Sequence, residues 1–367
     1  MRPTIAEINL AAIRHNIRQI QEAAGPDTKL FAAIKANAYG HGAVKVAQAA
    51  LSAGAYGLNV AIPEEGAELR AAGINAPILI LGVVLPEQAD YVIHHKLIAT
   101  VCTKEGIEAL AACAEKRNTR TPVMLKIDTG MGRIGIKPSQ FNEFKQLLAN
   151  RPSLELAGVF THLATADAAD KTYAIKQIED FNHIAHAMPE NCYISAANSA
   201  AIIDLSGGYS NMVRPGIIIY GLPPSSEMHK HLDLHPAMRL KTRIVFIKEV
   251  RPDTAVSYGC TYHTTQTTYL ATLPIGYADG YNRLLSNKAE VLIGGKRHPV
   301  VGRVCMDQII VDLGPKCDAH IGDEAVLFGR QGDAEITVTE LADLIGTINY
   351  ELVCAVSQRV PRVYLNE

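Results

Sequence analysis

The organisation of the chain follows from one stretch, Phe31-Ala-Ala-Ile-Lys-Ala-Asn-Ala-Tyr-Gly-His-Gly42. Its apolar start predicts a short buried strand, and that strand ends on a charged residue, Lys35. The glycines on either side of His41 allow the chain to turn into a helix. Because a bare ammonium is costly to bury, Lys35 is either used chemically or has its stem buried and its head in solvent.

Length and composition limit the possible classes of protein. A chain of 367 residues is too long for one ordinary core, so two domains are expected. The net charge of −2 gives no reason to expect a nucleic-acid or membrane partner. The N-terminus lacks a signal-peptide pattern, and the seven cysteines are scattered without a CxxC pair. We therefore expect a reduced, cytoplasmic protein.

Strand-like runs alternate with amphipathic helical stretches over the first two thirds of the chain. The runs lie at 30–35, 56–60, 78–81, 98–101, 123–128, 154–160, 193–196 and 212–214. This alternation is typical of parallel βα units, and eight units match an α/β fold of the (β/α)8 TIM-type barrel class. An open doubly wound sheet is the alternative. We predict a barrel domain over residues 1–235.

The pattern changes after Tyr220 to short strands and turns. Residues 238–250, 268–274, 290–293, 297–304, 308–313 and 325–328 have β character, which predicts a mostly antiparallel β domain over 236–367. His229, His231, Asp233 and His235 fall in the link between the two domains. We interpret this link as a solvated loop and expect no metal site there.

The predicted strand ends carry many hydrogen-bond donors. In a barrel these ends meet at the mouth that holds the active site. The donors there are Lys35, Tyr39, Arg133, His162, Asn198, Ser199 and Arg214, followed by the amides of Gly216 and Ile217. Bare amides after the last strands suit a phosphate. A phosphate site beside a reactive amine indicates pyridoxal 5'-phosphate, with Lys35 bound to its aldehyde and an arginine near its ring nitrogen.

A glycine motif offers a competing interpretation. Gly130-Met-Gly-Arg-Ile-Gly135 fits the dinucleotide fingerprint, which should open a helix directly and be followed about 20 residues later by an acidic residue. Ile136-Lys137-Pro138 intervene before the helix, and Glu155 lies at the start of the next strand rather than at its end. We therefore favour the pyridoxal site.

Seven further motifs, in order, resemble those of the bacterial alanine racemases. They are Asp128-Thr-Gly-Met-Gly-Arg-Ile-Gly135, Thr161-His162, Asn198-Ser199, Arg214-Pro-Gly216, Val256-Ser-Tyr-Gly259, Pro274-Ile-Gly-Tyr-Ala-Asp-Gly280 and Gly302-Arg-Val-Cys-Met-Asp307. The resemblance runs from the N-terminus to Pro361-Arg362. It implies a pyridoxal-phosphate barrel followed by a β domain, a head-to-tail homodimer, and two-base racemisation of alanine that supplies D-alanine for peptidoglycan.

The resemblance also assigns roles. Lys35 and Tyr258 would be the two bases, with Tyr258 donated by the other subunit; a core tyrosine of the β domain is the alternative. Arg133 would bind the substrate carboxylate and the cofactor's phenolic oxygen, and His162 would hold Arg214 against the ring nitrogen. Because arginine stays protonated, Arg214 would leave that nitrogen neutral and restrain transamination.

The remaining roles concern the phosphate, the partner subunit and the entrance. Phosphate contacts would come from Tyr39, Ser199, Gly216, Ile217 and Tyr350. The amide of Met306 would reach the substrate carboxylate in the partner. The entrance would carry Asp167, Arg283 and Arg303, each of which could equally be a solvated surface charge.

Lys126 attracts attention for a different reason. Period-two alternation over 123–128 places it on the same strand face as Met124 and Asp128. If that face lines the barrel, an ammonium is buried beside Arg133, which is costly. In relatives of the family the matching lysine is carbamylated, and we predict the same here; a neutral or solvent-reaching lysine is the alternative.

Two other functions stay open. A related barrel-type pyridoxal-phosphate decarboxylase would need an acidic partner for the ring nitrogen and a reactive cysteine, where this chain has Arg214 and Tyr258. A non-catalytic pyridoxal-phosphate carrier would need the barrel alone, so a β domain with Tyr258 and Met306 argues against it.

Overall fold

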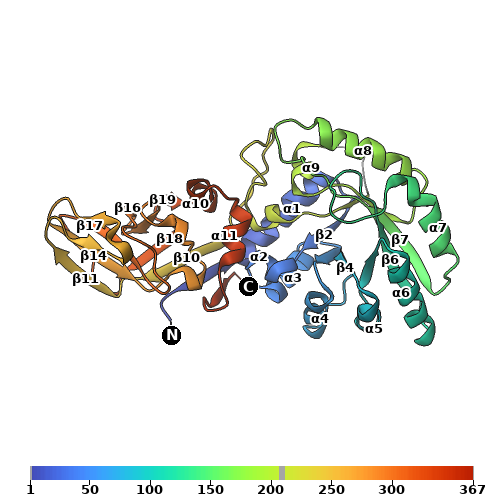
Figure 1. Cartoon of the computed structure of the whole chain (residues 1–367), viewed down its shortest axis with the longest axis horizontal. Coiled ribbons are helices and arrows are strands. Elements are labelled where there is room, and N and C mark those ends of the chain that lie inside the picture. Colours follow the sequence, from blue (N-terminus) through green and yellow to red (C-terminus); the bar gives the residue numbers. More distant parts are fainter. Residues whose placement is uncertain (1, 206–210, 367) are drawn as a thin grey trace. The chain divides into compact units, whose positions relative to one another are not determined.

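The computed structural model describes residues 2–205 and 211–366, which form two compact units (Figure 1). The barrel unit consists of Ala12–Ala38 and Ala43–His235. The β unit consists of Met1–Ala11, Tyr39–Gly42 and Pro236–Glu367. No helix in the described part of the chain is long and apolar enough to cross a bilayer.

Eight parallel strands form the sheet of the barrel unit, in the order β8-β7-β6-β5-β4-β3-β2-β9. They are β2 (Lys29–Ala33), β3 (Gly57–Val60), β4 (Ile78–Val83), β5 (Ile98–Val101), β6 (Thr121–Lys126), β7 (Leu154–Phe160), β8 (Tyr193–Ser195) and β9 (Met212–Val213). Just beyond β9, the Arg214 amide donates to the Ala197 carbonyl at 3.0 Å, which ties β9 to the chain that follows β8. The predicted (β/α)8 barrel is confirmed.

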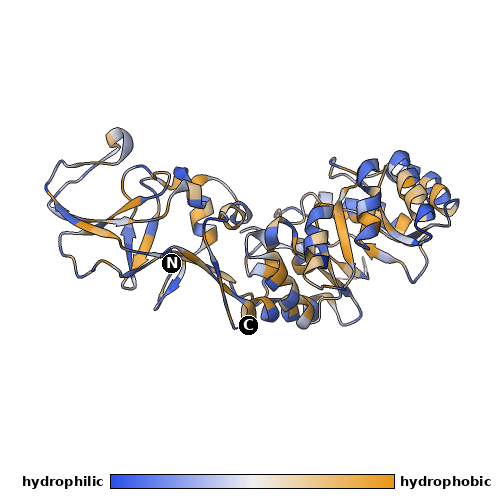
Figure 2. Ribbon diagram, turned by 90° about the horizontal axis from the view of Figure 1, so that it is seen from below, coloured by the Kyte–Doolittle hydropathy of each residue, from blue (hydrophilic) through white to orange (hydrophobic). Residues whose placement is uncertain are grey.

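The segments between the strands form helices because their apolar residues recur on one face. They are α3 (Ala43–Ser52), α4 (Pro63–Ala71), α5 (Ala89–His94), α6 (Lys104–Lys116), α7 (Phe141–Ala149), α8 (Thr172–Ala185) and α9 (Ser199–Asp204), with α1 (Leu10–Ala24) before β2. In α6 the Thr103 hydroxyl accepts from the Gly106 amide at 3.1 Å and caps the first turn. Figure 2 shows the apolar strands that these helices cover.

The interior of the barrel is a packed core. Side chains from six strands form one buried cluster: Phe31, Leu79, Ile98, Met124, Phe160 and Met212. Interdigitated apolar side chains of this kind fix the strand ends, and so they fix the positions of the residues that follow each strand.

The β unit is mostly antiparallel, as predicted. Its seven-stranded sheet has the order β16-β15-β18-β10-β1-β20, with β19 on β18. The strands are β1 (Ile5–Asn9), β10 (Met238–Arg243), β15 (Glu290–Ile293), β16 (Lys296–Pro299), β18 (Glu324–Gln331), β19 (Ala334–Ile336) and β20 (Arg362–Leu365). The N-terminal strand β1, which the sequence analysis missed, pairs antiparallel with β10 and parallel with β20.

A smaller sheet and two helices complete the β unit. The sheet has the order β11-β14-β17, with β11 (Phe246–Val250), β14 (Thr268–Leu273) and β17 (Ile309–Gly314). The short hairpin β12 (Ala255–Val256) and β13 (Tyr262–His263) carries the turn around Tyr258. The helices are α10 (Val338–Ile345) and α11 (Asn349–Ala355).

Candidate active site

Lys35 opens a left-handed turn at the C-terminal end of β2. The turn, α2 (Lys35–Tyr39), has positive φ at four consecutive non-glycine residues, with values of 51–53° from Ala36 to Tyr39. Left-handed backbone costs an L-residue about 1–2 kcal/mol each, and such strain persists only where surrounding contacts enforce it. The glycines at 40 and 42, to which the sequence analysis attributed the turn, lie after it.

Two side chains hold this turn in the barrel unit. The Glu65 carboxylate accepts from the Ala36 amide at 2.7 Å and from the Ala61 amide at 2.7 Å. The Asn37 side chain accepts from the Ala43 amide at 2.8 Å and so fixes the start of α3. Asparagine is among the residues that tolerate left-handed backbone, whereas alanine is not. These contacts of Ala36 and Asn37 therefore hold the strained turn that presents Lys35.

Arg214 is buried directly after β9. Its Nε donates to the Ser195 hydroxyl at 2.9 Å, and its Nη2 donates to the Thr161 carbonyl at 2.5 Å. Its guanidinium carbon lies 5.0 Å from the centre of the Phe160 ring. From the sequence, His162 was expected to hold Arg214; the acceptors of these two hydrogen bonds are Thr161, the neighbour of His162, and Ser195 of β8. Burial, and then the charge of Arg133, lower the pKa of Arg214 to about 10, so it stays protonated at pH 7.

Lys126 ends β6 and is 3% exposed, as the strand alternation predicted. Its ammonium nitrogen lies 4.7 Å from the centre of the Phe160 ring and has no hydrogen-bond partner among the described residues. Burial, followed by the charges of Arg214 and Arg133, lowers its pKa well below the ordinary value. The side chain is therefore a buried amine whose charged form is disfavoured by burial and by two nearby cations.

His162 follows β7 and is half-buried. Its pKa depends on the charged groups around the mouth of the barrel. Its pKa falls to about 2, because of burial and then the charges of Arg214, Lys126, Arg133 and Lys35. Four predicted site cations thus act on one imidazole, which stays neutral at all working pH values. A positive pocket of this kind favours anionic ligands.

The residues that follow β8 and β9 are in contact with one another. The Gly216 amide donates to the Ser199 hydroxyl at 2.8 Å, which leaves the hydroxyl proton able to bond elsewhere. Ile217 begins a 3-10 turn, Ile217–Tyr220, directly after Gly216. Asn198 caps α9 by accepting from the Ala201 amide at 3.0 Å.

The glycine motif is folded around a carboxylate. Asp128 accepts from the Gly130 amide at 3.0 Å and from the Gly132 amide at 3.1 Å, so these amides are not directed at a ligand phosphate. A Cβ at Gly135 would lie 2.7 Å from the Asp128 amide nitrogen, which explains a glycine there. The loop carries Arg133, which is exposed. Because the glycine amides bond to Asp128, the loop does not support the dinucleotide interpretation.

Tyr258 sits at the tip of the β12–β13 hairpin in the β unit and is 71% exposed. The adjacent Ser257 has φ 64° and Cys260 has φ 48°, so this turn is also left-handed at non-glycine residues. The Ser257 hydroxyl donates to the Arg303 carbonyl at 2.6 Å, and the Arg303 guanidinium lies against Gly259. Met306 is 52% exposed in the same unit.

The other predicted residues lie as follows. In the β unit, Tyr39 is buried with its ring centre 6.1 Å from that of Tyr350, and burial, then the nearby Cys354 thiol, raises the pKa of Tyr39. Its hydroxyl is therefore protonated and able to donate. Asp167 in the barrel unit and Arg283 in the β unit are exposed.

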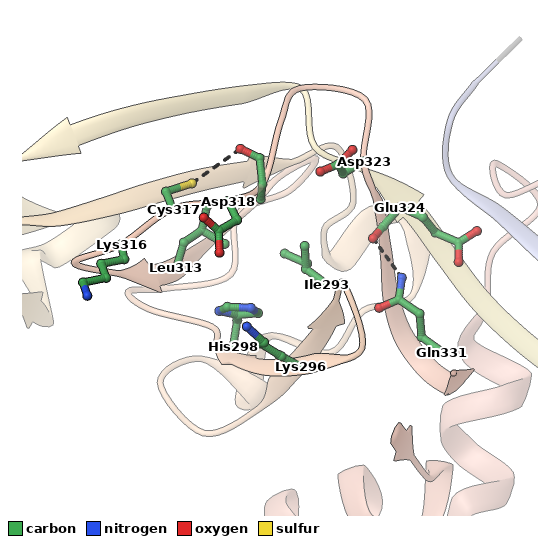
Figure 3. Close-up of a pocket in the computed structure, with 12 residues that line it drawn as sticks. Ile293, Lys296, His298, Leu313, Lys316, Cys317, Asp318, Asp323, Glu324 and Gln331 are labelled. Carbon is green, nitrogen blue, oxygen red and sulfur yellow. Dashed lines mark hydrogen bonds between the residues drawn. The ribbon is translucent and has the colours of Figure 1, made fainter. Parts of the chain in front are cut away.

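A pocket of about 490 Å³ lies wholly within the β unit (Figure 3). Side chains of both charges line it, including Lys296, His298, Asp318 and Glu324. The Cys317 thiol donates to the Ala319 carbonyl at 3.5 Å and is not presented as a nucleophile. None of the predicted site residues lines this pocket.

The barrel mouth fits pyridoxal phosphate by its chemistry. It combines an amine at a strand end, a hydroxyl and an amide for a phosphate, and a buried arginine, Arg214, whose hydrogen bonds go to uncharged oxygens. The ring nitrogen of the cofactor would meet an arginine.

Comparison with known proteins decides the family. The model of the alanine racemase N-terminal domain matches residues 8–224, and that of the C-terminal domain matches residues 237–364. The chain belongs to the alanine racemase family. The alanine racemase of Desulfovibrio desulfuricans is 48% identical, covering 99% of this chain and 98% of its own. That of Halothermothrix orenii is 45% identical, covering 100% and 98%.

Solved structures of the family agree. Alanine racemase of Clostridium difficile 630 has a TM-score of 0.93 at 42% identity, covering 100% of this chain and 96% of its own. A histidine racemase from Leuconostoc mesenteroides has a TM-score of 0.91 at 29% identity, covering 100% and 98%. The predicted family, isomerase class and pyridoxal-phosphate dependence are confirmed.

Several residues of the site escaped the sequence analysis. Thr161 and Ser195 orient Arg214, Phe160 lies beneath Lys126 and Arg214, and Glu65 holds the Lys35 turn. Thr161 and Ser195 are recognisable only as neighbours of strand ends. Glu65 gave no signal, because its target lies 29 residues away along the chain.

Proposed function

We propose that this chain interconverts L-alanine and D-alanine with pyridoxal 5'-phosphate bound at the mouth of the barrel unit, and supplies D-alanine for peptidoglycan. The observation that carries the proposal is the set of basic groups around His162, which includes the cations Lys35, Arg133 and Arg214. A cofactor phosphate and a substrate carboxylate would supply the negative charge that these cations require.

The chain's own groups would hold the cofactor at three points. Lys35 would bind its aldehyde, and Arg214, with His162 nearby, would face its ring nitrogen. Asn198 would contribute to the cofactor site, and the phosphate would be bound by a set of hydroxyls and amides: Tyr39, Ser199, Gly216, Ile217 and Tyr350. When bound, the cofactor withdraws electrons from the substrate Cα and makes its proton acidic.

Arg214 would select racemisation over other reactions of this cofactor. With a pKa of about 10 it stays charged, so it does not give a proton to the ring nitrogen. By leaving the ring nitrogen unprotonated, Arg214 would favour return of the proton to Cα over transamination. Its contacts with Thr161 and Ser195 keep it in this position.

Lys35 and Tyr258 would exchange the Cα proton from opposite faces. One side chain cannot serve both faces, and we propose that Tyr258 comes from the second chain of a homodimer. Its exposure supports this assignment, because the hydroxyl is accessible to another molecule. As a base it needs cations that stabilise phenolate, and Arg303 beside its own turn and Arg133 of the other chain would supply them.

We further propose that Arg133 and the Met306 amide bind the substrate carboxylate. Asp167, Arg283 and Arg303 would line the entrance. Residues 1–235 and 236–367 would act as the cofactor-binding and partner-completing domains, and the protein would work in the cytoplasm.

Lys126 would carry a carbamate. Burial and the charges of Arg214 and Arg133 lower the pKa of Lys126 and so favour the uncharged amine, whose nitrogen would attack the carbon of CO2, form an N–C bond and release a proton. The resulting anion would lie beside Arg133 and Arg214 and orient them. Enzyme labelled with 13C-bicarbonate should show a carbamate carbon resonance that is absent from Lys126→Ala; no resonance in either protein removes the assignment.

The direct test is formation of D-alanine from L-alanine by purified holoenzyme. Lys35→Ala should reduce it by about 10⁴-fold or more and Tyr258→Phe by about 10²- to 10⁴-fold, and basic amino acids should not lose CO2. Cofactor binding without turnover would instead identify a carrier. Histidine belongs in the substrate panel, because a histidine racemase shares the fold.

A further inference from the structure

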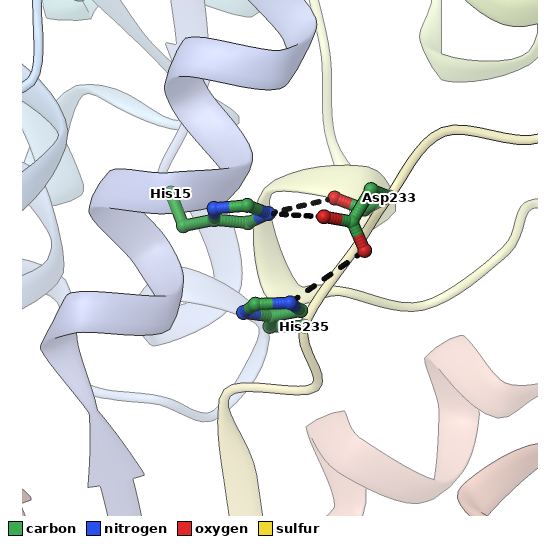
Figure 4. A group of neighbouring side chains, drawn as sticks. All are labelled: His15, Asp233 and His235. Carbon is green, nitrogen blue, oxygen red and sulfur yellow. Dashed lines mark hydrogen bonds and ion pairs between the residues drawn. The ribbon is translucent and has the colours of Figure 1, made fainter.

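A cluster of three metal-ligating side chains that are not among the proposed pyridoxal-phosphate residues lies on the barrel unit (Figure 4). His15 comes from α1, while Asp233 and His235 come from the segment that ends the unit. The two imidazole rings are stacked, with centres 3.9 Å apart and planes 5° apart. Figure 4 shows both rings presenting a nitrogen to the same carboxylate.

The distances within this cluster are short. His15 Nε2 lies 3.3 Å from one Asp233 carboxylate oxygen and 2.9 Å from the Asp233 carbonyl oxygen. His235 Nε2 lies 3.6 Å from the other carboxylate oxygen. All three ligand atoms fall within 4.8 Å of one another.

A buried asparagine fixes the backbone of this cluster. Asn16, the neighbour of His15, is fully buried; its side-chain nitrogen donates to the His235 carbonyl at 2.9 Å and its oxygen accepts from the His235 amide at 2.8 Å. One helix turn therefore supplies a ligand and positions a second, while the side chains of Asp233 and His235 remain accessible to solvent.

We propose that His15, Asp233 and His235 bind a divalent transition-metal ion of the zinc type, with solvent water as the remaining ligand. Two imidazoles with one carboxylate suit zinc and its neighbours, whereas magnesium and calcium prefer oxygen ligands alone. A tetrahedral zinc site with bonds of 2.0–2.1 Å separates its ligand atoms by about 3.4 Å. The two His–Asp separations, which run to different oxygens of the carboxylate, are close to this value, and the stacked rings would tilt on binding to direct both imidazole nitrogens at one ion.

Such an ion would join α1 to the segment before Pro236, more than two hundred residues later in the sequence. Because the unfolded chain does not hold these ligands together, bound metal favours the folded protein in proportion to its affinity. The site is separate from the pyridoxal-phosphate site, so racemisation should continue without the metal.

The test is titration of chelator-treated holoenzyme with Zn²⁺ by calorimetry, followed by thermal unfolding. His15→Gln and His235→Gln should each weaken the affinity for Zn²⁺ by at least about tenfold. Loss of a group that only contacts a metal ligand already weakens metal affinity by about 10- to 100-fold, and here a ligand itself is lost. His231→Gln is the matched control: this exposed histidine lies in the same segment outside the cluster, and its loss should leave binding unchanged. Zn²⁺ should raise the unfolding temperature of the parent and the control, but not of the two variants.

Crystals soaked in Zn²⁺ provide an independent readout. An anomalous peak about 2.0–2.1 Å from both Nε2 atoms supports the site. The proposal is overturned if the parent protein binds no Zn²⁺, if His15→Gln and His235→Gln bind as the parent does, or if His231→Gln loses the ion equally. The cluster would then be a hydrogen-bonded tie between α1 and the chain.

Discussion

The two turns that carry the proposed bases are alike in backbone and opposite in surroundings. The Lys35 turn has left-handed residues at Ala36–Tyr39, and the Tyr258 turn has them at Ser257 and Cys260. In both turns the backbone adopts a conformation that costs free energy, and each turn presents one side chain. Lys35 lies among the cations of the barrel mouth, whereas Tyr258 is 71% exposed at a hairpin tip.

This difference separates what one chain supplies from what it lacks. The environment of Lys35 is made within the barrel unit by Glu65, Arg214 and their partners. A tyrosine at a solvent-exposed tip has no comparable surroundings to make it a base. The account therefore requires a second chain to complete the site, and the following variants break or sharpen that comparison.

Lys35→Ala should have the largest effect. It removes both the attachment of the cofactor and one base, so racemisation should fall by about 10⁴-fold or more. The measurement is D-alanine production together with the absorbance of protein-bound cofactor. Lys137→Ala, an exposed lysine in the barrel unit, is the control and should behave as the parent. Retention of activity by Lys35→Ala would remove Lys35 from the mechanism.

Tyr258→Phe should reduce racemisation by about 10²- to 10⁴-fold, the usual contribution of one general base. Exchange on the Lys35 face should survive, so one enantiomer of alanine should still exchange its Cα hydrogen in D2O without inversion. The control is Tyr262→Phe, which removes a hydroxyl that donates to Asp312 at 3.0 Å and should leave exchange intact. Equal loss of exchange for both enantiomers of alanine would contradict separate faces.

Arg214→Glu should change the ratio of transamination to racemisation more than it changes substrate binding. A carboxylic acid facing the ring nitrogen shares a proton with it, so pyruvate formation relative to racemisation should rise by about tenfold, equivalent to about 1.4 kcal/mol between the two barriers. Arg214→Lys keeps a cation at this position and should not show this rise. An unchanged ratio in Arg214→Glu would exclude Arg214 as the determinant of reaction type.

His162→Gln should give the smallest effect, a change in the pH dependence of stability. The folded pKa is about 2 and the ordinary value is about 6.5, so only the unfolded chain binds this proton between these pH values. Stability is therefore lost as pH falls below about 6.5, by up to about 2 kcal/mol at pH 5. In urea unfolding of cofactor-free protein, His162→Gln should lose less stability from pH 7 to 5 than His186→Gln, an exposed control. Parallel curves would contradict the lowered pKa.

The sequence predicted the barrel because eight apolar runs had lengths and spacings that no other fold fits as well. It missed β1, since Ile5–Asn9 is short and pairs with β10 more than two hundred residues later. It also missed the left-handed form of the Lys35 turn. Alanine has no preference for that backbone, and the contact that enforces it comes from Glu65.

The residues of the site were predictable where they follow strands, and their partners were not. Arg214 and Lys126 could be placed from strand ends and alternation, but Thr161, Ser195 and Phe160 orient them through contacts between neighbouring strands. The link histidines were interpreted as solvated because His15, which lies beside His235, is distant in sequence.

The shared site is tested most directly by mixing two inactive variants. Lys35→Ala and Tyr258→Phe should each be inactive alone. After the chains are dissociated and reassociated together, half of the dimers should be mixed, each with one complete site made of Lys35 from one chain and Tyr258 from the other. The account predicts recovery of about a quarter of the parent activity, as a symmetric dimer requires. No recovery, with mixed dimers demonstrated by mass, would contradict a site shared between two chains.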